Sequence, residues 1–362
     1  MPHRLFLLSV LLGSFLGLAA QAPVPALIGY YAGDGDDVRA RDLTQLTHVI
    51  HCFQVLQGDS LRPMGRDQEK ALRRLNGFKR MKPDLKVLLS FGGWGGCATC
   101  SEVFGREEGR RRFARSVHAL LKRTWTDGID LDWEYPAVQG PPGHAFHADD
   151  RHNFTLLVRA LREELGPKYE ISFAAGGTEE CLLKGYEWDS IMPVVDRVHI
   201  MSYDLVHGTS TTTGHHTPLY SSKQQTASLD QAVYLLRKAG VPAEKIVAGA
   251  AFYARVFRTS TAANNGLYQP ATFSHTVPWH QLEATITEAA GWKWFLDPAT
   301  QAPYAWNAAD KLFLTCDNVQ SVQAKARFVR TQRLGGIMFW QLRDDKATGG
   351  LMDALYKELY KP

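Results

Sequence analysis

The sequence predicts an α/β protein, a parallel (β/α)8 barrel with a small α+β insertion near its C-terminal end. Short apolar runs recur eight times along the 362 residues, and amphipathic helical patterns lie between several of them. Residues 258–318, between the last two runs, show no simple single helix, and a structureless loop of that length would be unusual. The alternative is a doubly wound open sheet, but no G-x-G-x-x-G motif opens a helix after the first run.

Each of the eight runs has the length and apolar content of a buried strand. We expect barrel strands within residues 26–33, 46–56, 85–94, 127–136, 169–177, 195–205, 245–257 and 334–342. A helix over residues 107–125 would bury one apolar face, which consists of Phe113, Val117, Leu120 and Leu121. Residues 153–165 show a similar pattern, and residues 228–240 open with a capping box formed by Ser228 and Gln231.

The N-terminus predicts export. A short basic start precedes an apolar run of 16 residues, so residues 1–22 are interpreted as a secretory signal peptide. The alternative is an uncleaved anchor, but the run is short for a spanning helix of about 20 residues. The TIM-barrel domain would then comprise residues 23–257 and 319–362, with the insertion at 258–318. We expect a secreted protein, extracellular or, in a bacterium, periplasmic, without a membrane partner after cleavage.

The composition and the cysteines exclude several functions. The net charge is only +4, and no basic run is interleaved with aromatic residues, so no nucleic-acid partner is expected. Five cysteines are odd in number and too few for a disulfide scaffold. Cys97 and Cys100 form a C-x-x-C pair without a second pair, so a zinc ribbon is not predicted and a local disulfide stays open. Cys52 and Cys316 lie in apolar runs and should be small buried side chains.

The stretch DGIDLDWEYP concentrates acidic residues inside a predicted strand. Alternate residues of a strand face opposite sides, so Asp130, Asp132 and Glu134 share one face. In a barrel this face points inward and leads toward the C-terminal mouth, where such enzymes keep their active sites. Like charges in a confined space raise at least one pKa, which makes Glu134 a candidate general acid. The opposite face would pack against the helices and consists of Ile129, Leu131 and Trp133.

A metal site is the alternative use of clustered carboxylates. No His or Asp cluster with ligand spacing accompanies them in the sequence. The histidines near the sixth run are interpreted as surface-loop residues, and they are His207, His215 and His216. We therefore predict neither a metal nor another cofactor.

The acidic stretch matches the D-x-x-D-x-D-x-E signature of glycoside hydrolase family 18, the chitinases, which the chain resembles. Four further motifs resemble the family's motifs and follow in its order: SFGGW (90–94), MSYD (201–204), FYAR (252–255) and GIMFWQL (336–342). The resemblance covers nearly all of the mature chain. The segment after the seventh strand resembles the family's insertion domain, which forms one wall of the substrate cleft.

The resemblance implies a substrate-assisted mechanism, in which the 2-acetamido oxygen of the sugar attacks the anomeric carbon. Glu134 would protonate the glycosidic oxygen and later deprotonate water. Asp132 would hold the acetamido N–H, Asp130 would share a proton or hydrogen bond with Asp132, and Tyr203 would donate to the acetamide. These four residues are the predicted catalytic set.

The resemblance also implies a set of substrate-binding positions. Tyr30, with Tyr31 as its competitor, and Ser90 would hydrogen-bond the inner aspartate. Trp340 would form the apolar floor under the −1 sugar, and Arg255 would position a cleft acid or bind sugar. The predicted substrate-binding residues are Tyr30, Ser90, Trp94, Met201, Asp204, Arg255 and Trp340.

The resemblance implies a chitinase that cleaves β-1,4-linked N-acetylglucosamine chains. With the predicted signal peptide, we expect it to be secreted, and we expect it to be a monomer. An endo-β-N-acetylglucosaminidase acting on N-glycans is one alternative. A non-catalytic chitin lectin is the other, although lectins of this kind usually lack the acid at the position of Glu134. The expected partner is chitin or a chitooligosaccharide.

Overall fold

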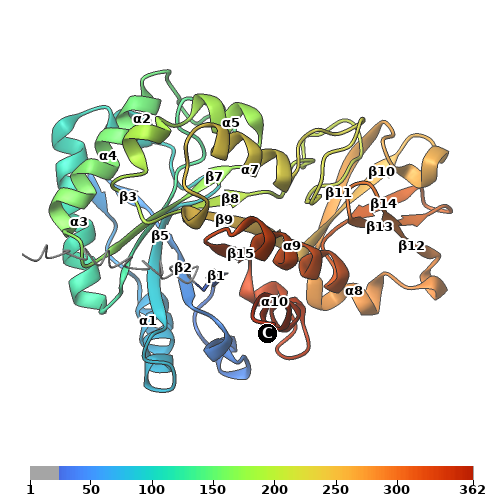
Figure 1. Ribbon diagram of the computed structural model, residues 1–362, viewed down its shortest axis with the longest axis horizontal. Coiled ribbons are helices and arrows are strands. Elements are labelled where there is room, and N and C mark those ends of the chain that lie inside the picture. Colours follow the sequence, from blue (N-terminus) through green and yellow to red (C-terminus); the bar gives the residue numbers. More distant parts are fainter. Residues whose placement is uncertain (1–23, 362) are drawn as a thin grey trace, which may run out of the picture.

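The computed structural model describes residues 24–361, so the signal peptide predicted at 1–22 lies outside the described part. Eight parallel strands close into a barrel in the order β1-β15-β9-β8-β7-β6-β5-β2, which confirms the predicted fold class (Figure 1). The barrel strands are β1 (Ala26–Tyr31), β2 (His48–Gln54), β5 (Lys86–Gly92), β6 (Gly128–Asp132), β7 (Glu170–Gly176), β8 (Arg197–Met201), β9 (Ile246–Ala251) and β15 (Gly336–Trp340). Within residues 24–361 no helix is long and apolar enough to cross a membrane.

Helices cover the outside of the barrel (Figure 1). The α-helices of the barrel are α1 (Arg66–Gly77), α2 (Cys100–Phe104), α3 (Glu107–Thr124), α4 (Asp150–Leu165), α5 (Glu179–Lys184), α6 (Trp188–Ile191), α7 (Leu229–Lys238), α9 (Val319–Gln332) and α10 (Leu351–Leu359). Short 3-10 helices are η1 (Asp37–Ala40), η2 (Leu43–Gln45), η3 (Phe78–Arg80), η4 (Ala243–Lys245), η5 (Ala263–Gly266), η6 (Glu288–Ala290) and η7 (Leu342–Asp344), and a small hairpin consists of β3 (Leu56–Gln57) and β4 (Ser60–Leu61). The predicted apolar face of α3 is buried, and the Ser228 side chain caps α7 by accepting the Gln231 N–H.

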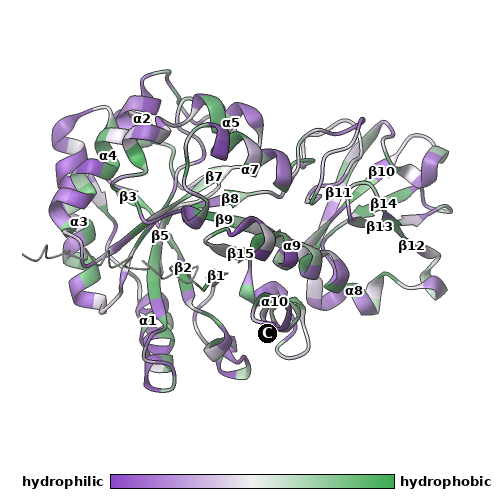
Figure 2. Ribbon diagram, viewed as in Figure 1, coloured by the Kyte–Doolittle hydropathy of each residue, from purple (hydrophilic) through white to green (hydrophobic). Residues whose placement is uncertain are grey.

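The apolar side chains form two layers, one on each side of the barrel wall. The outer layer packs strands against helices and includes Leu27 and Ile129, whereas the inner layer fills the barrel and includes Ile28 and Leu88. Neighbouring residues enter different layers because alternate residues of a strand face opposite sides. In Figure 2, β5 is largely green, while α1 and α3 carry purple outer faces. The interior of the barrel is therefore filled by apolar side chains, and polar side chains there need a specific reason.

The insertion is a five-stranded antiparallel sheet in the order β11-β10-β14-β13-β12, with one helix against it. Its elements are β10 (Tyr253–Thr259), β11 (Ala271–Pro278), α8 (Trp279–Thr285), β12 (Trp292–Asp297), β13 (Ala302–Asn307) and β14 (Leu312–Thr315). The prediction of one strand over 245–257 is wrong, because β9 ends at Ala251 and β10 belongs to the second sheet. Phe252 marks the break: its N–H donates to the Trp340 carbonyl (2.8 Å), and its carbonyl accepts the Trp279 N–H (2.9 Å).

The cysteines follow the sequence-based expectations. Cys52 and Cys316 are buried with free thiols. A disulfide joins Cys97 and Cys100 in the segment between β5 and α2, where the sequence left a local bridge open. Trp94 lies three residues before this bridge, on the same connection after β5.

Candidate active site

Strand β6 places the three predicted carboxylates inside the barrel, at increasing height. Asp130 is fully buried, while Asp132 and Glu134 are 5% and 9% exposed. Asp132 is the last residue of β6, so Glu134 lies just beyond the strand's carboxyl end. Trp133 faces outward as predicted, since its ring packs 5.4 Å from that of Phe104 between strands and helices.

Asp130 is held by hydroxyl groups from three other strands. Tyr30 on β1 and Ser90 on β5 donate to Oδ2 at 2.9 and 3.0 Å, and Ser172 on β7 donates to Oδ1 at 2.7 Å. Burial raises the pKa of Asp130 to about 6, and these three hydroxyls oppose the shift because they stabilise the carboxylate. The competing Tyr31 instead donates to Asp37, at 2.6 Å.

His199 on β8 completes this cluster, and neither His199 nor Ser172 was among the predicted residues. The Nδ1 of His199 lies 2.7 Å from the Tyr30 hydroxyl and 3.4 Å from Asp130 Oδ1. A tyrosine hydroxyl has one proton, so if Tyr30 donates to Asp130, the proton between Tyr30 and His199 must come from Nδ1. The inward alternation of β7 and β8 could have identified Ser172 and His199 as barrel-interior residues.

Asp132 differs from Asp130 in having few partners. Its buried Oδ1 accepts no hydrogen bond from the described residues. Burial, followed by the charges of Glu134 and Asp130, raises the pKa of Asp132 well above its ordinary value. The structure shows no hydrogen bond between Asp130 and Asp132 among the described residues, and the proton or hydrogen bond that the resemblance implies between them stays a prediction.

Glu134 has the electrostatics of a general acid. Burial raises its pKa to about 7, and the nearby charge of Asp204 acts in the same direction. An acid with this pKa carries its proton in much of the population near neutral pH, and it can give that proton up and take it back.

Asp204 and Arg255 form an ion pair at the mouth of the barrel. The Arg255 Nη2 lies 2.6 Å from Asp204 Oδ2, and its Nε bonds to Oδ1. His216 lies 3.5 Å from the same Oδ1 and is fully buried, as is His215, so the interpretation of these two histidines as surface residues is wrong. Burial alone would raise the pKa of Asp204, but His216 and Arg255 hold it well below its usual range. Of its two predicted roles, Arg255 therefore fits that of positioning an acid.

Aromatic and sulfur-containing side chains pack inside the barrel beside these carboxylates. Trp340, at the end of β15, stacks on Phe53 with 5.5 Å between the ring centroids. The Tyr30 ring lies tilted against Trp340, with 6.0 Å between the centroids. The Tyr203 hydroxyl lies 3.8 Å from the Met338 sulfur, and Met201 belongs to the same cluster. Phe53 was not among the predicted residues, because it lies within β2, in a run that is typical of an ordinary buried strand.

Trp94 lies apart from the buried side chains described above. Its side chain is 64% exposed on the loop after β5, so it is not a core residue. Among residues 24–361, no group of three or more His, Cys, Asp or Glu side chains could hold a metal ion.

Known proteins place this site in a family. The family model "Glycosyl hydrolases family 18" matches residues 26–345. Chitinase A1 of Niallia circulans is 32% identical over 299 residues, 76% of this chain and 43% of that protein. Chitotriosidase-1 of Mus musculus is 30% identical over 325 residues, 84% of this chain and 68% of that protein.

A solved structure extends the likeness to three dimensions. The family 18 N-acetylglucosaminidase from Paenibacillus barengoltzii is 35% identical and aligns with a TM-score of 0.85, covering 92% of this chain and all of that one. The fold, the order of the motifs and the match over most of the sequence agree, and the chain belongs to glycoside hydrolase family 18.

Proposed function

We propose that this chain is a secreted, monomeric chitinase that hydrolyses β-1,4-linked N-acetylglucosamine chains with retention of configuration. The observation that carries the proposal is the column of Asp130, Asp132 and Glu134, which rises from the barrel interior to its mouth. The relatives named Chitinase A1 and Chitotriosidase-1 support chitin or a chitooligosaccharide as the substrate.

In the proposed reaction, Glu134 gives its proton to the glycosidic oxygen as the bond to the anomeric carbon breaks. The substrate's acetamido oxygen attacks that carbon from the opposite face and forms an oxazolinium ion. Glu134 then takes a proton from water. The water oxygen attacks the anomeric carbon, and the bond between that carbon and the acetamido oxygen breaks. An intramolecular nucleophile can have an effective molarity of about 10⁵ M or more, so a protein nucleophile is unnecessary.

The other buried groups serve this intermediate. The free Oδ1 of Asp132 is suited to accept the acetamido N–H, and its negative charge would stabilise the positive ion. Tyr203 would donate to the acetamido oxygen, while Trp340 would cover the apolar face of the −1 sugar. Asp204, kept ionised by Arg255, would bind sugar hydroxyls, and Trp94 would line the open part of the cleft.

The test combines one variant with product analysis. Glu134→Gln should lower hydrolysis of chitin oligosaccharides by about 10²-fold or more while binding is retained, since the amide keeps the shape and loses the proton. Asp127→Asn, a change at the other end of the same acidic stretch, is the matched control. Partly deacetylated chitosan should yield N-acetylated reducing ends, because only such a −1 sugar carries the nucleophile. A substantial share of glucosamine at those ends would rule out the substrate-assisted mechanism.

A second candidate is an N-acetylglucosaminidase that acts on short oligomers or on glycans. This chain covers the Paenibacillus barengoltzii enzyme completely, and that likeness supports this second candidate. Products from chitin oligosaccharides and from a glycoprotein, analysed side by side, separate the two. Oligosaccharide products from long chains support the chitinase, and single N-acetylglucosamine units as the only product support the alternative.

A further inference from the structure

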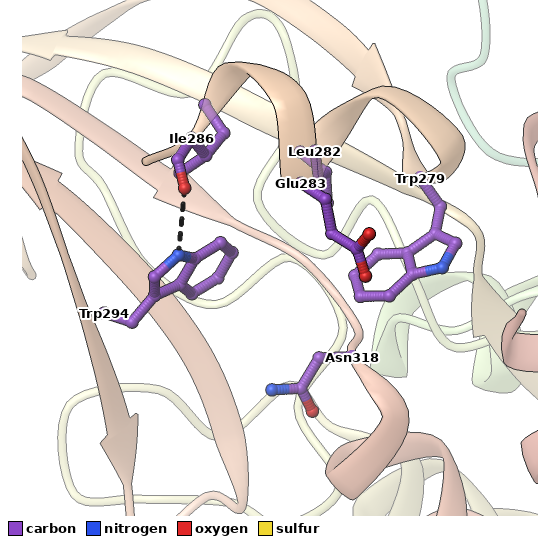
Figure 3. A pocket seen from close by; sticks show the side chains of 6 residues that line it. All are labelled: Trp279, Leu282, Glu283, Ile286, Trp294 and Asn318. Carbon is purple, nitrogen blue, oxygen red and sulfur yellow. Dashed lines mark hydrogen bonds between the residues drawn. The ribbon is translucent and has the colours of Figure 1, made fainter. Parts of the chain in front are cut away.

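A pocket of about 330 Å³ lies on the insertion, between α8, the edge strand β12 and the residue that precedes α9 (Figure 3). No residue assigned above to hydrolysis contributes to its wall. Its lining residues are Trp279, Leu282, Glu283, Ile286, Trp294 and Asn318.

Two indole rings flank the pocket. Trp279, Leu282 and Ile286 recur at helical spacing along α8, while Trp294 faces them from β12 (Figure 3). The Trp294 N–H donates to the Ile286 carbonyl at 3.2 Å, which fixes the orientation of the ring. Trp294 is 40% exposed, so part of its ring surface remains available to a ligand.

Polar groups stand beside these rings. Asn318 uses its side-chain oxygen to cap α9 by accepting the Ser321 N–H at 2.9 Å, and its amide nitrogen has no hydrogen-bond partner in the described part of the chain. Glu283 also lines the pocket (Figure 3), and its carboxylate forms a surface ion pair with Lys346 at 2.6 Å. The pocket thus offers an amide donor and a carboxylate acceptor next to flat apolar surfaces.

We propose that this pocket is a non-catalytic binding site for the N-acetylglucosamine chain, an inference that rests on the proposed function. A pyranose ring has an apolar face that suits an indole, and its hydroxyl and acetamido groups suit the carboxylate and the amide. The volume is at the lower end of the range of about 300–1,000 Å³ that small-molecule sites occupy, which fits one sugar unit better than a large ligand.

A second depression, along α9, is a further surface that a polymer, unlike a single sugar, could contact. It has a volume of about 340 Å³ and also borders α9 and the turn after β12, with Tyr220 and Phe328 in its wall. Leu296, two residues after Trp294 and on the same face of β12, is 37% exposed. A chain held here and in the catalytic cleft would be bound at two places, which raises the effective concentration of substrate at the cleft.

The experiment measures binding to insoluble chitin in a Glu134→Gln background, so that the polymer is not consumed. Trp294→Ala should weaken binding several-fold. Trp125→Ala removes a tryptophan that is 82% exposed at the end of α3, and it should leave binding unchanged. With Glu134 intact, Trp294→Ala should hydrolyse soluble chitotriose at the rate of the parent, and its unfolding temperature should stay within a few degrees.

Other outcomes would overturn the inference. If Trp294→Ala binds chitin as the parent does, or if Trp125→Ala weakens binding equally, the pocket holds no sugar chain. A dimer in sedimentation velocity that Trp294→Ala dissociates would make a second copy of this chain the occupant. A parent that neither binds nor hydrolyses chitin would refute the proposed function itself, whereas a hydrolysing parent with an unaffected Trp294→Ala variant refutes only the pocket.

Discussion

Burial opposes charge on the carboxyl groups inside the barrel, and the stability of the protein therefore depends on which of them are protonated. Alternation along β6 was enough to predict that Asp130, Asp132 and Glu134 share the interior. The family resemblance predicted Tyr30 and Ser90 as partners of Asp130. Alternation also places Ser172 and His199 in the interior, but their contact with Asp130 depends on the register between neighbouring strands, which the sequence does not show.

Glu134→Gln should make the protein less sensitive to pH. The folded-state pKa of Glu134, about 7, lies above its ordinary value of 4.5, so the folded state binds more protons between these values and stability falls as pH rises through them. The shift corresponds to at most about 3 kcal/mol. Urea unfolding across this range should show the variant gaining stability relative to the parent as pH rises from about 4.5 to about 7, with a constant difference above pH ~7.

Glu170→Gln is the control of opposite sign. Burial alone would raise the pKa of Glu170, but bonds from His48, Lys86 and Arg197 hold it well below its usual range. Its stabilising contribution is present above an ordinary pKa and is lost as pH falls, so this variant should lose stability at neutral pH and approach the parent in acid. Differences that do not change with pH in either variant would contradict the assignment of these shifts.

His199→Leu should change how the activity depends on pH. Without the Nδ1 proton, the Tyr30 hydroxyl loses its donor and its bond to Asp130 weakens, so the pKa of Asp130 should rise. The acid limb of the kcat profile, which reports ionisation of the buried aspartates, should then move to higher pH. His199→Gln keeps a donor and should move it less. Equal profiles for both variants would assign His199 a packing role alone.

At the scale of elements, a buried ion pair fixes the segment that leads from the insertion sheet back to the barrel. Lys325 on α9 and Asp317 are both fully buried, with Nζ 2.7 Å from Oδ2. The same Oδ2 accepts the Ala251 N–H at the end of β9 (3.0 Å), and Thr217 accepts from Lys325. The segment that follows the insertion is thereby bound to the end of β9, the strand that precedes the insertion.

Neither this pair nor the break after β9 could be predicted. A lysine in an amphipathic helix ordinarily faces solvent, and residues 245–257 form a continuous strand-like run. Hydrogen bonds from Phe252 to distant residues separate β9 from β10 within that run. Local strand propensity does not predict such tertiary bonds. The apolar face of α3 was predictable, because its spacing alone defines it.

Lys325→Met should destabilise the protein by about 3–5 kcal/mol, since it leaves the Asp317 charge buried without its counter-ion. Lys184→Met is the matched control, because Lys184 pairs with Glu180 at the surface, with both side chains more than half exposed. That change should cost less than about 1 kcal/mol. Chemical unfolding with a conserved m-value measures both, and similar losses in the two variants would mean that the buried pair contributes little.

At the scale of the whole molecule, the insertion shares its core with the barrel. Trp279, Leu282, Ile286 and Trp292 belong to the same continuous apolar cluster as the residues beneath the barrel helices. A smaller cluster that includes Phe257 and Phe313 lies on the other face of the insertion sheet. One face of the insertion is therefore part of the main core.

This shared core predicts a single cooperative unfolding transition. Two domains with independent cores unfold separately, whereas removing the insertion here would expose the part of the main core that Trp279 and Leu282 cover. Scanning calorimetry of the full chain should give a van't Hoff enthalpy equal to the calorimetric one. Leu282→Ala, a fully buried change in the insertion, should cost about 2–5 kcal/mol and lower that one transition as a whole. A second transition, with only one of the two moved by Leu282→Ala, would show instead that barrel and insertion fold as separate units.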